Sequence, residues 1–295
     1  MKKQLVFRGA ATALITPLTE TGVDYDALGS LIDWQIEQGI DALVIAGTTG
    51  EKSTLNDAEH KAVLEFCVER IGGRVPMIAG TGSNDTAYGL SLSRHACSIG
   101  ADALLVVTPY YNKATQQGLI KVYNTIADAS TRPVIVYNVP SRTGVNIEPA
   151  TYAALARHPN IVGIKEANGN IAQIVETSAL VGEDLTLYSG NDDQIVPILS
   201  MGGQGVISVL SNLLPKETSR LCHRFFEGDV AGAAAMQRQY LPLIKALFCE
   251  VNPIPVKAAM AALGRCQNHV RLPLTVMEPA HAETLYARMR EQGLL

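Results

Sequence analysis

Short apolar runs rich in β-branched residues recur eight times along the chain, each followed by an amphipathic stretch. In those stretches apolar residues return at the three- and four-residue spacing of a one-sided helix, as at Leu28, Leu31 and Ile32. Continuous apolar strands that alternate with helices indicate a parallel sheet whose outer face the helices cover. The runs lie at residues 10–16, 42–47, 76–80, 103–109, 133–139, 161–167, 186–190 and 205–210.

Eight such units predict an α/β fold of the closed (β/α)₈ type, the TIM barrel, which needs roughly 200 residues or more in one domain. An open doubly wound sheet is the main alternative, but no Gly-x-Gly-x-x-Gly turn follows the first run. The strand pattern stops after Pro215. We therefore expect a barrel domain over 1–228 and a C-terminal helical appendage over 229–295. Asn56 and Glu59 predict a capping box at the start of the second helix.

Composition excludes several classes of protein. With 47% hydrophobic and 18% charged residues, the chain can bury a large core. A net charge of −4 without a Lys/Arg cluster predicts no nucleic-acid partner, and no stretch reaches the roughly 18 apolar residues of a membrane span. The five scattered cysteines fit free thiols, and no two of the six histidines have metal-ligand spacing. We expect a soluble, cytoplasmic protein without a metal.

Polar residues follow most of the apolar runs. In a barrel of this kind the binding site forms at the carboxyl ends of the strands. Each polar cluster alone is explained by turn chemistry, because Gly, Asn, Pro and Ser favour turns. Their coincidence on one rim favours a shared pocket. The clusters are Thr16, 47–51, 108–112, 137–144, 165–166 and 189–192.

Lys165 is the most unusual residue of this rim, because it ends the apolar run Ile-Val-Gly-Ile-Lys (161–165). Burial of an ammonium group is costly or lowers its pKa, and a lysine with a lowered pKa can form a Schiff base with a carbonyl compound. Within the run alone, a lysine that buries only its stem and reaches solvent is the simpler interpretation. Its place on the polar rim favours the Schiff-base interpretation.

Four other residues of the rim have two interpretations each. Tyr137 can shuttle a proton if its pKa falls below ~10, or it is a barrel tyrosine with a hydrogen-bonded hydroxyl. Thr48 and Thr49 can bind a carboxylate, or they belong to an ordinary turn. Arg142 can clamp a carboxylate with its planar fork, or it is a solvated surface arginine.

Four stretches of the rim are specific in their order: Gly-Thr-Thr-Gly-Glu (47–51), Pro-Tyr-Tyr-Asn (109–112), Tyr-Asn-Val-Pro-Ser-Arg-Thr-Gly (137–144) and Gly-Ile-Lys-Glu-Ala (163–167). Together they resemble the 4-hydroxy-tetrahydrodipicolinate synthase (dihydrodipicolinate synthase) family of pyruvate-dependent class I aldolases. The resemblance extends to 252–257 and 271–274 and covers essentially the whole chain. It implies a lyase that condenses pyruvate with L-aspartate 4-semialdehyde, the first committed step of the diaminopimelate route to lysine.

The resemblance implies catalytic roles for four residues. Lys165 matches the lysine that forms an imine with pyruvate, so that no separate cofactor is required. Tyr137, Thr48 and Tyr111 match a proton-relay triad. In the family the residue matching Tyr111 comes from a neighbouring subunit, so the active unit is at least a homodimer, and a dimer of dimers (a homotetramer) is common.

It also implies how the substrates are held. Thr48 and Thr49 match the positions that bind the pyruvate carboxylate, and Arg142 matches the arginine that binds the carboxylate of the aldehyde. Gly190 and Ile207 match backbone positions that line the pocket near the lysine.

Two other functions stay open. The first is an aldolase of N-acetylneuraminate or of a 2-keto-3-deoxy sugar acid, against which Arg142 argues, because those branches carry other residues there. The second is a non-catalytic regulator that binds a keto acid. The presence of Lys165 together with Tyr137, Thr48 and Tyr111 argues against it, because a binder needs no proton relay.

The chain departs from the family where free lysine binds its feedback-inhibited members. Tyr88 stands in place of a glutamate, Asp57 in place of a histidine and Lys52 in place of a serine. A tyrosine cannot neutralise an ammonium group and Lys52 repels one, so we expect weak or absent inhibition by lysine. Three further departures are Asn168, Asn170 and Asn191.

Overall fold

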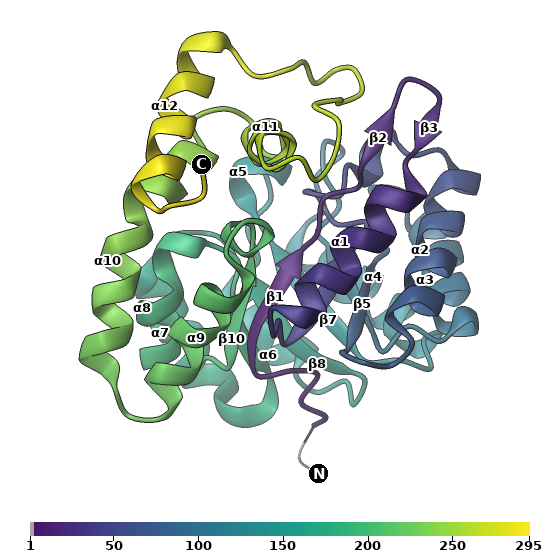
Figure 1. Cartoon of the computed structure of the whole chain (residues 1–295). Coiled ribbons are helices and arrows are strands. Elements are labelled where there is room, and N and C mark those ends of the chain that lie inside the picture. The colour runs from purple at the N-terminus through teal and green to yellow at the C-terminus, as the bar shows by residue number, and fades with distance from the viewer. Residues whose placement is uncertain (1–2) are drawn as a thin grey trace.

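The computed structural model describes residues 3–295 and confirms the closed parallel barrel of eight strands (Figure 1). Each strand falls on one predicted run to within a few residues. β1 pairs with both β4 and β10, which closes the ring. The strands are β1 (Gly9–Ala13), β4 (Ala42–Ile45), β5 (Met77–Gly80), β6 (Ala103–Val107), β7 (Val134–Asn138), β8 (Ile161–Glu166), β9 (Thr186–Ser189) and β10 (Gly205–Ser208).

Helices cover the outside of the barrel. They are α1 (Tyr25–Glu37), α2 (Asp57–Ile71), α3 (Thr86–Ile99), α4 (Gln116–Asp128), α6 (Pro149–Leu155), α7 (Ile171–Val181), α8 (Ile195–Ser200) and α9 (Pro215–Phe226). The predicted capping box of α2 is confirmed: Asn56 Oδ1 accepts from the Glu59 amide at 2.9 Å, and Glu59 Oε2 accepts from the Asn56 amide at 3.0 Å. A small hairpin, β2 (Leu18–Thr19) with β3 (Gly22–Val23), is not predicted by the sequence pattern because each strand has only two residues.

The interior of the barrel is filled from alternate strand positions. Side chains such as Val44, Ile135 and Ile207 form a cluster separate from the larger one between strands and helices. Phe7, just before β1, stacks on Tyr188 with ring centroids 4.2 Å apart. These rings fill the barrel on the side where β1 begins, so polar side chains are left to gather at the carboxyl ends of the strands.

The C-terminal region consists of α10 (Val230–Leu247), α11 (Ile254–Ala262) and α12 (Pro279–Glu291). Figure 1 shows α11 at the end of the barrel opposite the N-terminus, the end to which the strands point. The predicted boundary between 228 and 229 falls in the turn between α9 and α10, and the division into two domains stays a prediction. Among residues 3–295, no helix is long and apolar enough to cross a membrane.

Candidate active site

Lys165 and Tyr137 meet inside the barrel. They are register partners on the neighbouring strands β8 and β7. Lys165 Nζ lies 4.1 Å from the centre of the Tyr137 ring, and the two residues are only 6% and 7% exposed. Side chains alternate along a strand, so Lys165 faces the barrel interior while Glu166 faces the helices. Lys165 is therefore not a lysine that reaches solvent.

Burial changes the acid–base chemistry of Lys165. Removal of water from around the amine lowers its pKa to about 7, because the ammonium form loses its hydration. The Asp192 carboxylate raises this pKa and the Arg142 guanidinium lowers it, each by a smaller amount. A substantial share of the side chain is therefore a neutral, nucleophilic amine near pH 7.

The proton-shuttle interpretation of Tyr137 depends on a lowered pKa, and the surroundings of this side chain act in the opposite direction. Burial raises the pKa of its phenol, because the phenolate would lose its hydration. Arg142 and a side-chain hydrogen bond with Thr48 act in the lowering direction but do not cancel the effect of burial. Tyr137 is therefore protonated at neutral pH and can start a reaction as a proton donor, not as a base.

The loop after β4 carries Thr48 and Thr49. Thr49 is 2% exposed, and its Oγ1 accepts a hydrogen bond of 3.0 Å from Asn252 Nδ2. Gly50 follows in a tight space: a Cβ there would lie 3.1 Å from the carbonyl oxygen of Leu14, closer than most such contacts. The loop thus lies close to the strands. Thr48 forms a hydrogen bond with Tyr137, and Thr49 forms one with Asn252 of the C-terminal region.

Arg142 lies on the short helix α5 (Pro140–Thr143), and its Nη2 donates to the backbone oxygen of Asn252 at 3.0 Å. Its charge lowers the pKa values of both Lys165 and Tyr137, which places the guanidinium within electrostatic range of both. Arg142 is exposed, but its hydrogen bond to Asn252 ties it to the C-terminal region, which distinguishes it from a freely solvated arginine.

Gly190 and Ile207 lie on the neighbouring part of the rim. The amide of Gly190 donates to the Glu166 oxygen at 2.7 Å, and a Cβ at this position would lie 2.8 Å from the Ala167 Cβ. Glycine is thus required where the ends of β8 and β9 come together. Ile207 on β10 is 1% exposed and belongs to the same interior cluster as Tyr137.

The structure does not bring Tyr111 to the other residues. Its side chain is 91% exposed, and its backbone has φ 71°, a left-handed conformation that is costly for a non-glycine residue. Asn112 supports the loop by donating to the Asn84 oxygen at 2.9 Å. In a single chain, as described over 3–295, the Tyr111 side chain therefore points into solvent and contacts none of the other predicted site residues.

Asp192 is a residue of this site that the sequence pattern did not single out. It is 2% exposed, and its Oδ2 accepts from the amides of Val209 and Leu210, both at 2.9 Å. Burial raises the pKa of Asp192, whereas these hydrogen bonds and the charge of Lys165 lower it. The only sequence feature that pointed to Asp192 was its position after the seventh apolar run. A polar residue at a strand end is common, and the sequence does not reveal that this one is buried near Lys165.

Glu166 supports β8 from behind Lys165. It is 2% exposed, and its carboxylate accepts from the Tyr152 hydroxyl at 2.8 Å and from Asn138 Nδ2 at 3.0 Å. Burial raises the pKa of Glu166 to about 7. This network fixes the strand end that carries the amine.

The unusual asparagines have local roles. The Asn168 amide donates to Glu166 Oε1, and its Oδ1 accepts from the Asn170 amide, both at 2.8 Å. Asn170 is the N-cap of α7 and accepts from the Gln173 amide at 3.2 Å. Asn191 donates its backbone N–H to Ser189 Oγ at 3.2 Å and so belongs to the turn after β9.

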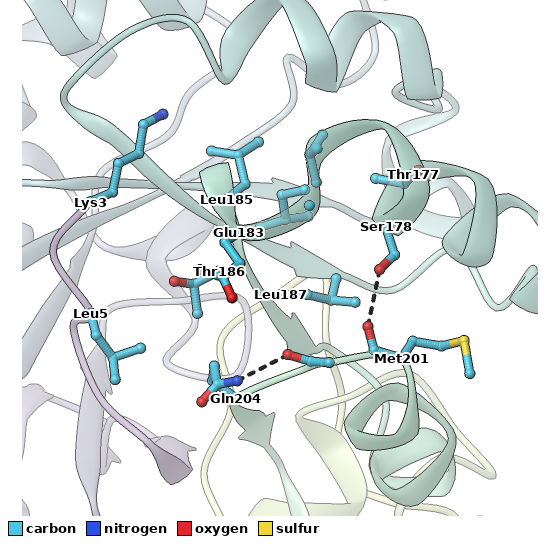
Figure 2. A pocket seen from close by; sticks show the side chains of 14 residues that line it. Lys3, Leu5, Thr177, Ser178, Glu183, Leu185, Thr186, Leu187, Met201 and Gln204 are labelled. Atoms are coloured by element: carbon cyan, nitrogen blue, oxygen red, sulfur yellow. Dashed lines mark hydrogen bonds between the residues drawn. The ribbon is translucent and has the colours of Figure 1, made fainter. Parts of the chain in front are cut away.

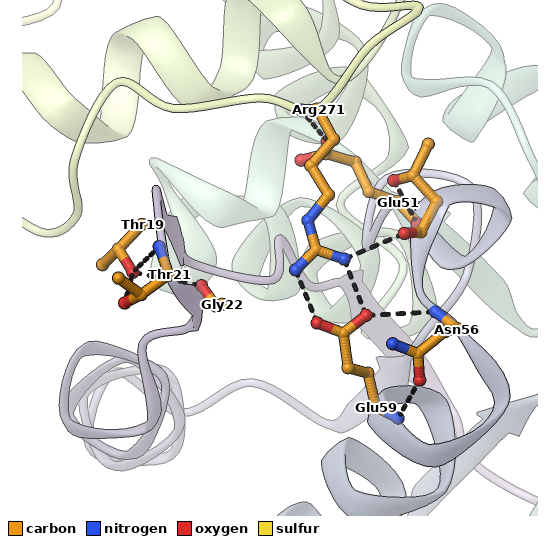
Figure 3. Close-up of polar contacts among 8 residues, drawn as sticks. Thr19, Thr21, Gly22, Glu51, Asn56, Glu59 and Arg271 are labelled. Carbon is orange, nitrogen blue, oxygen red and sulfur yellow. Dashed lines mark hydrogen bonds and ion pairs between the residues drawn. The ribbon is translucent and has the colours of Figure 1, made fainter.

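A buried ion pair connects the C-terminal region to the threonine loop, and a partly exposed ion pair connects the same region to α2. Lys257 Nζ lies 2.5 Å from Glu51 Oε1, and neither side chain is exposed by more than 1%. Arg271 donates to both oxygens of Glu59 at 2.7 and 2.6 Å. Figure 3 shows Arg271 lying between Glu51 and Glu59. Through Glu51, the loop that carries Thr48 and Thr49 is therefore fixed to the C-terminal region.

Two cavities lie on different sides of the barrel. One, of about 450 Å³, is lined by Asn168, Asn191 and Asp192 next to the lysine. Another, of about 420 Å³, lies between the N-terminal segment and α7 and is lined by residues such as Lys3 and Thr186 (Figure 2). In the part of the chain that the structure describes, neither cavity is lined by the residues that the sequence predicts for the site. The first is the one connected to the site, because its lining includes Asp192, whose charge acts on Lys165.

Known proteins resemble this chain over almost its whole length. The model of the dihydrodipicolinate synthetase family matches residues 6–292. A 4-hydroxy-tetrahydrodipicolinate synthase of Alkaliphilus oremlandii is 51% identical over 290 residues, which cover 98% of this chain and 100% of the relative.

Solved structures agree with this relationship. A crystal structure of dihydrodipicolinate synthase from Aquifex aeolicus has a TM-score of 0.96 and 44% identity, covering 98% of this chain and 99% of that one. The chloride-inhibited enzyme of Acinetobacter baumannii, complexed with pyruvate, has a TM-score of 0.95 and 40% identity, with the same coverage of 98% and 99%. With the buried lysine and its rim, these similarities show that the chain belongs to the dihydrodipicolinate synthetase family.

Proposed function

We propose that the chain condenses pyruvate with L-aspartate 4-semialdehyde through a Schiff base on Lys165, giving 4-hydroxy-tetrahydrodipicolinate. This reaction is the first committed step of lysine synthesis through diaminopimelate. The observation that carries the proposal is the buried Lys165 amine, with a pKa of about 7, against the Tyr137 ring. The relatives that share its family support the substrates, and the Acinetobacter baumannii relative is described with pyruvate.

The proposed reaction starts with the neutral amine of Lys165. It attacks the ketone carbon of pyruvate, and Tyr137, protonated at neutral pH, donates a proton to the hydroxyl that leaves as water. The Tyr137 phenolate then takes a methyl proton from the resulting protonated imine, which becomes an enamine. The enamine carbon attacks the aldehyde, and Tyr137 returns the proton to the new alkoxide. The amino group of the second substrate then attacks the imine carbon, closes the ring and releases Lys165.

The carboxylates of the two substrates are bound separately in this scheme. Thr48 and Thr49 bind that of pyruvate, and Arg142 binds that of the aldehyde. The backbones of Gly190 and Ile207 line the pocket. No separate cofactor or metal takes part in the proposed reaction, because the imine with the lysine supplies the electron sink.

The pH dependence of imine formation follows from the pKa of Lys165. Only the neutral amine attacks, so the rate with pyruvate should rise about tenfold between pH 6 and pH 8 and then level off. An ordinary lysine would give a rise of about a hundredfold over this range that continues above pH 9. Stopped borohydride trapping followed by mass spectrometry measures this rate, and a continued rise above pH 9 would contradict the lowered pKa.

Arg142 tests the identity of the second substrate. In Arg142→Ala, kcat/KM for aspartate semialdehyde should fall by roughly ten- to a hundredfold, because a charge-assisted hydrogen bond to a carboxylate is worth about 1.5–3 kcal/mol. Borohydride trapping of pyruvate on Lys165 should persist in this variant.

The substrate itself is tested with the parent chain, which should turn over aspartate semialdehyde. Turnover of N-acetylneuraminate alone would identify a sugar-acid aldolase. The absence of a trapped adduct would contradict every aldolase function.

We also propose a homodimer as the minimum active unit, because Tyr111 is exposed in a single chain. A dimer of dimers is supported by α7, which leaves Ile171, Val175 and Leu180 exposed. Analytical ultracentrifugation of the native protein measures its mass in solution and so tests both the dimer and the dimer of dimers. The cytoplasm is the proposed location, since all five cysteines are free.

Inhibition by lysine should be weak or absent at sub-millimolar concentration. Lys52 donates its Nζ to the Gly82 oxygen, and burial lowers its pKa only to about 8, so it is mostly charged at pH 7. Tyr88 shares a hydrogen bond with Asp57 and brings no charge to balance an ammonium group. A coupled assay with added lysine tests this, and Lys52→Ser is the matched variant in which the repulsion is removed.

A further inference from the structure

Asn252 contacts two side chains that the proposed function assigns to different substrates. It lies between α10 and α11 and is 5% exposed. Its Nδ2 donates to Thr49 Oγ1, and its backbone oxygen accepts from Arg142 Nη2, both at 3.0 Å. One residue of the C-terminal region thus touches both of the proposed carboxylate-binding groups.

The hydrogen bond to Thr49 determines where the threonine proton points. A threonine hydroxyl has one proton to donate, and an ionised carboxylate can only accept. Because Thr49 Oγ1 accepts from Asn252, its proton remains available to a substrate carboxylate. Without the amide, the hydroxyl would have to be oriented when the substrate binds.

The orientation of the Asn252 amide decides whether the Thr49 proton is available to a substrate. Its Oδ1 is buried and has no hydrogen-bond partner among residues 3–295. An amide turned the other way would direct Oδ1 at Thr49 and take the hydroxyl proton for itself. The orientation in the structure leaves Oδ1 unpaired and keeps the Thr49 proton free.

A second contact fixes the distance between Asn252 and the threonine loop. The Lys257 amide donates to the Pro253 oxygen at 2.9 Å, so Lys257 lies in the first turn of the helix that follows Asn252. Its side chain forms the buried pair with Glu51, two residues after Thr49. The two segments are thus joined at two points.

We propose that Asn252 is a positioning residue for pyruvate, which orients the Thr49 hydroxyl toward the substrate carboxylate. The inference rests on the proposed function, in which Thr49 binds pyruvate and Lys165 traps it. The backbone oxygen that holds Arg142 remains when the side chain is replaced. The effect of a substitution is therefore confined to the pyruvate side of the site.

The test compares Asn252→Ala and Asn252→Asp with the parent chain in borohydride trapping and steady-state kinetics. In both variants the KM for pyruvate and the half-saturating pyruvate concentration in trapping should rise about tenfold, with kcat and the KM for the aldehyde within about twofold. Aspartate has nearly the shape of asparagine but cannot donate when ionised. A parental KM for pyruvate in either variant would overturn the inference.

Coupling to Thr49 separates positioning from general destabilisation. Asn252→Ala added to Thr49→Val should give no further rise in the KM for pyruvate, and a further rise would overturn the inference. Asn160→Ala is the matched control: Asn160 donates to three backbone oxygens outside the site, so this variant should lose stability at an unchanged KM. A raised KM in this control would also overturn it.

Failure of the inference differs from failure of the proposed function. A parent chain that traps no pyruvate on Lys165 contradicts the function itself. A parent chain that traps pyruvate, with variants that do so at the same concentrations, contradicts only the role of Asn252.

Discussion

Replacement of Lys165 by alanine should lower kcat by at least about a thousandfold and abolish the borohydride-trapped pyruvate adduct. The amine is the group that forms the covalent intermediate, and its buried position beside Tyr137 lowers its pKa to about 7. Loss of the amine leaves Arg142 and the threonines able to bind substrates but unable to join them. Intact-protein mass spectrometry and the coupled assay measure both effects.

The matched control for this experiment is Lys121→Ala, because Lys121 is exposed on α4. This variant should keep the adduct and the parental rate. Peptide mapping of the trapped parent chain locates the modified lysine. An adduct on another lysine, or one that persists in Lys165→Ala, would contradict the assignment.

The largest loss of stability is expected for Lys257→Met. It leaves Glu51 buried without its partner, which typically costs about 3–5 kcal/mol in free energy of unfolding. The double variant Glu51→Gln, Lys257→Met should recover much of this loss, because no uncompensated charge stays inside. Urea denaturation followed by circular dichroism measures the three free energies of unfolding.

An exposed ion pair is the control for this loss. Lys61 and Asp57, one turn apart on α2, form such a pair at the surface. Lys61→Met should change the denaturation midpoint little, since solvent screens exposed pairs. A similar loss for the exposed pair, or no recovery in the buried double variant, would show that burial of charge is not the cause.

Local sequence predicted the barrel because its strands are buried on both faces. Such strands must be apolar throughout, so residues 103–109 and 161–167 stand out from their surroundings. The expectation that buried strands are apolar also made Lys165 conspicuous, because it is a charged residue at the end of one of these runs. The hairpin of β2 and β3 escaped prediction because two residues per strand carry no periodicity.

The rest of the site depends on contacts that sequence spacing does not contain. Asn252 and Thr49 are 203 positions apart, and their hydrogen bond exists only because the C-terminal region folds over the rim. The raised pKa of Tyr137 comes from burial, which its residue type does not reveal. The same holds for Asp192, whose carboxylate is held by backbone amides of another loop.

The sequence by itself determined the barrel, the lysine and the family, because periodicity and motif order are properties of neighbouring residues. Only the tertiary structure decided which side chains are buried from solvent, which of them are protonated, and which chain segments support the site. These properties depend on the loss of water and on distances between remote residues. Burial lowers the pKa of Lys165 and raises that of Tyr137 for one reason: in both side chains it disfavours the charged form.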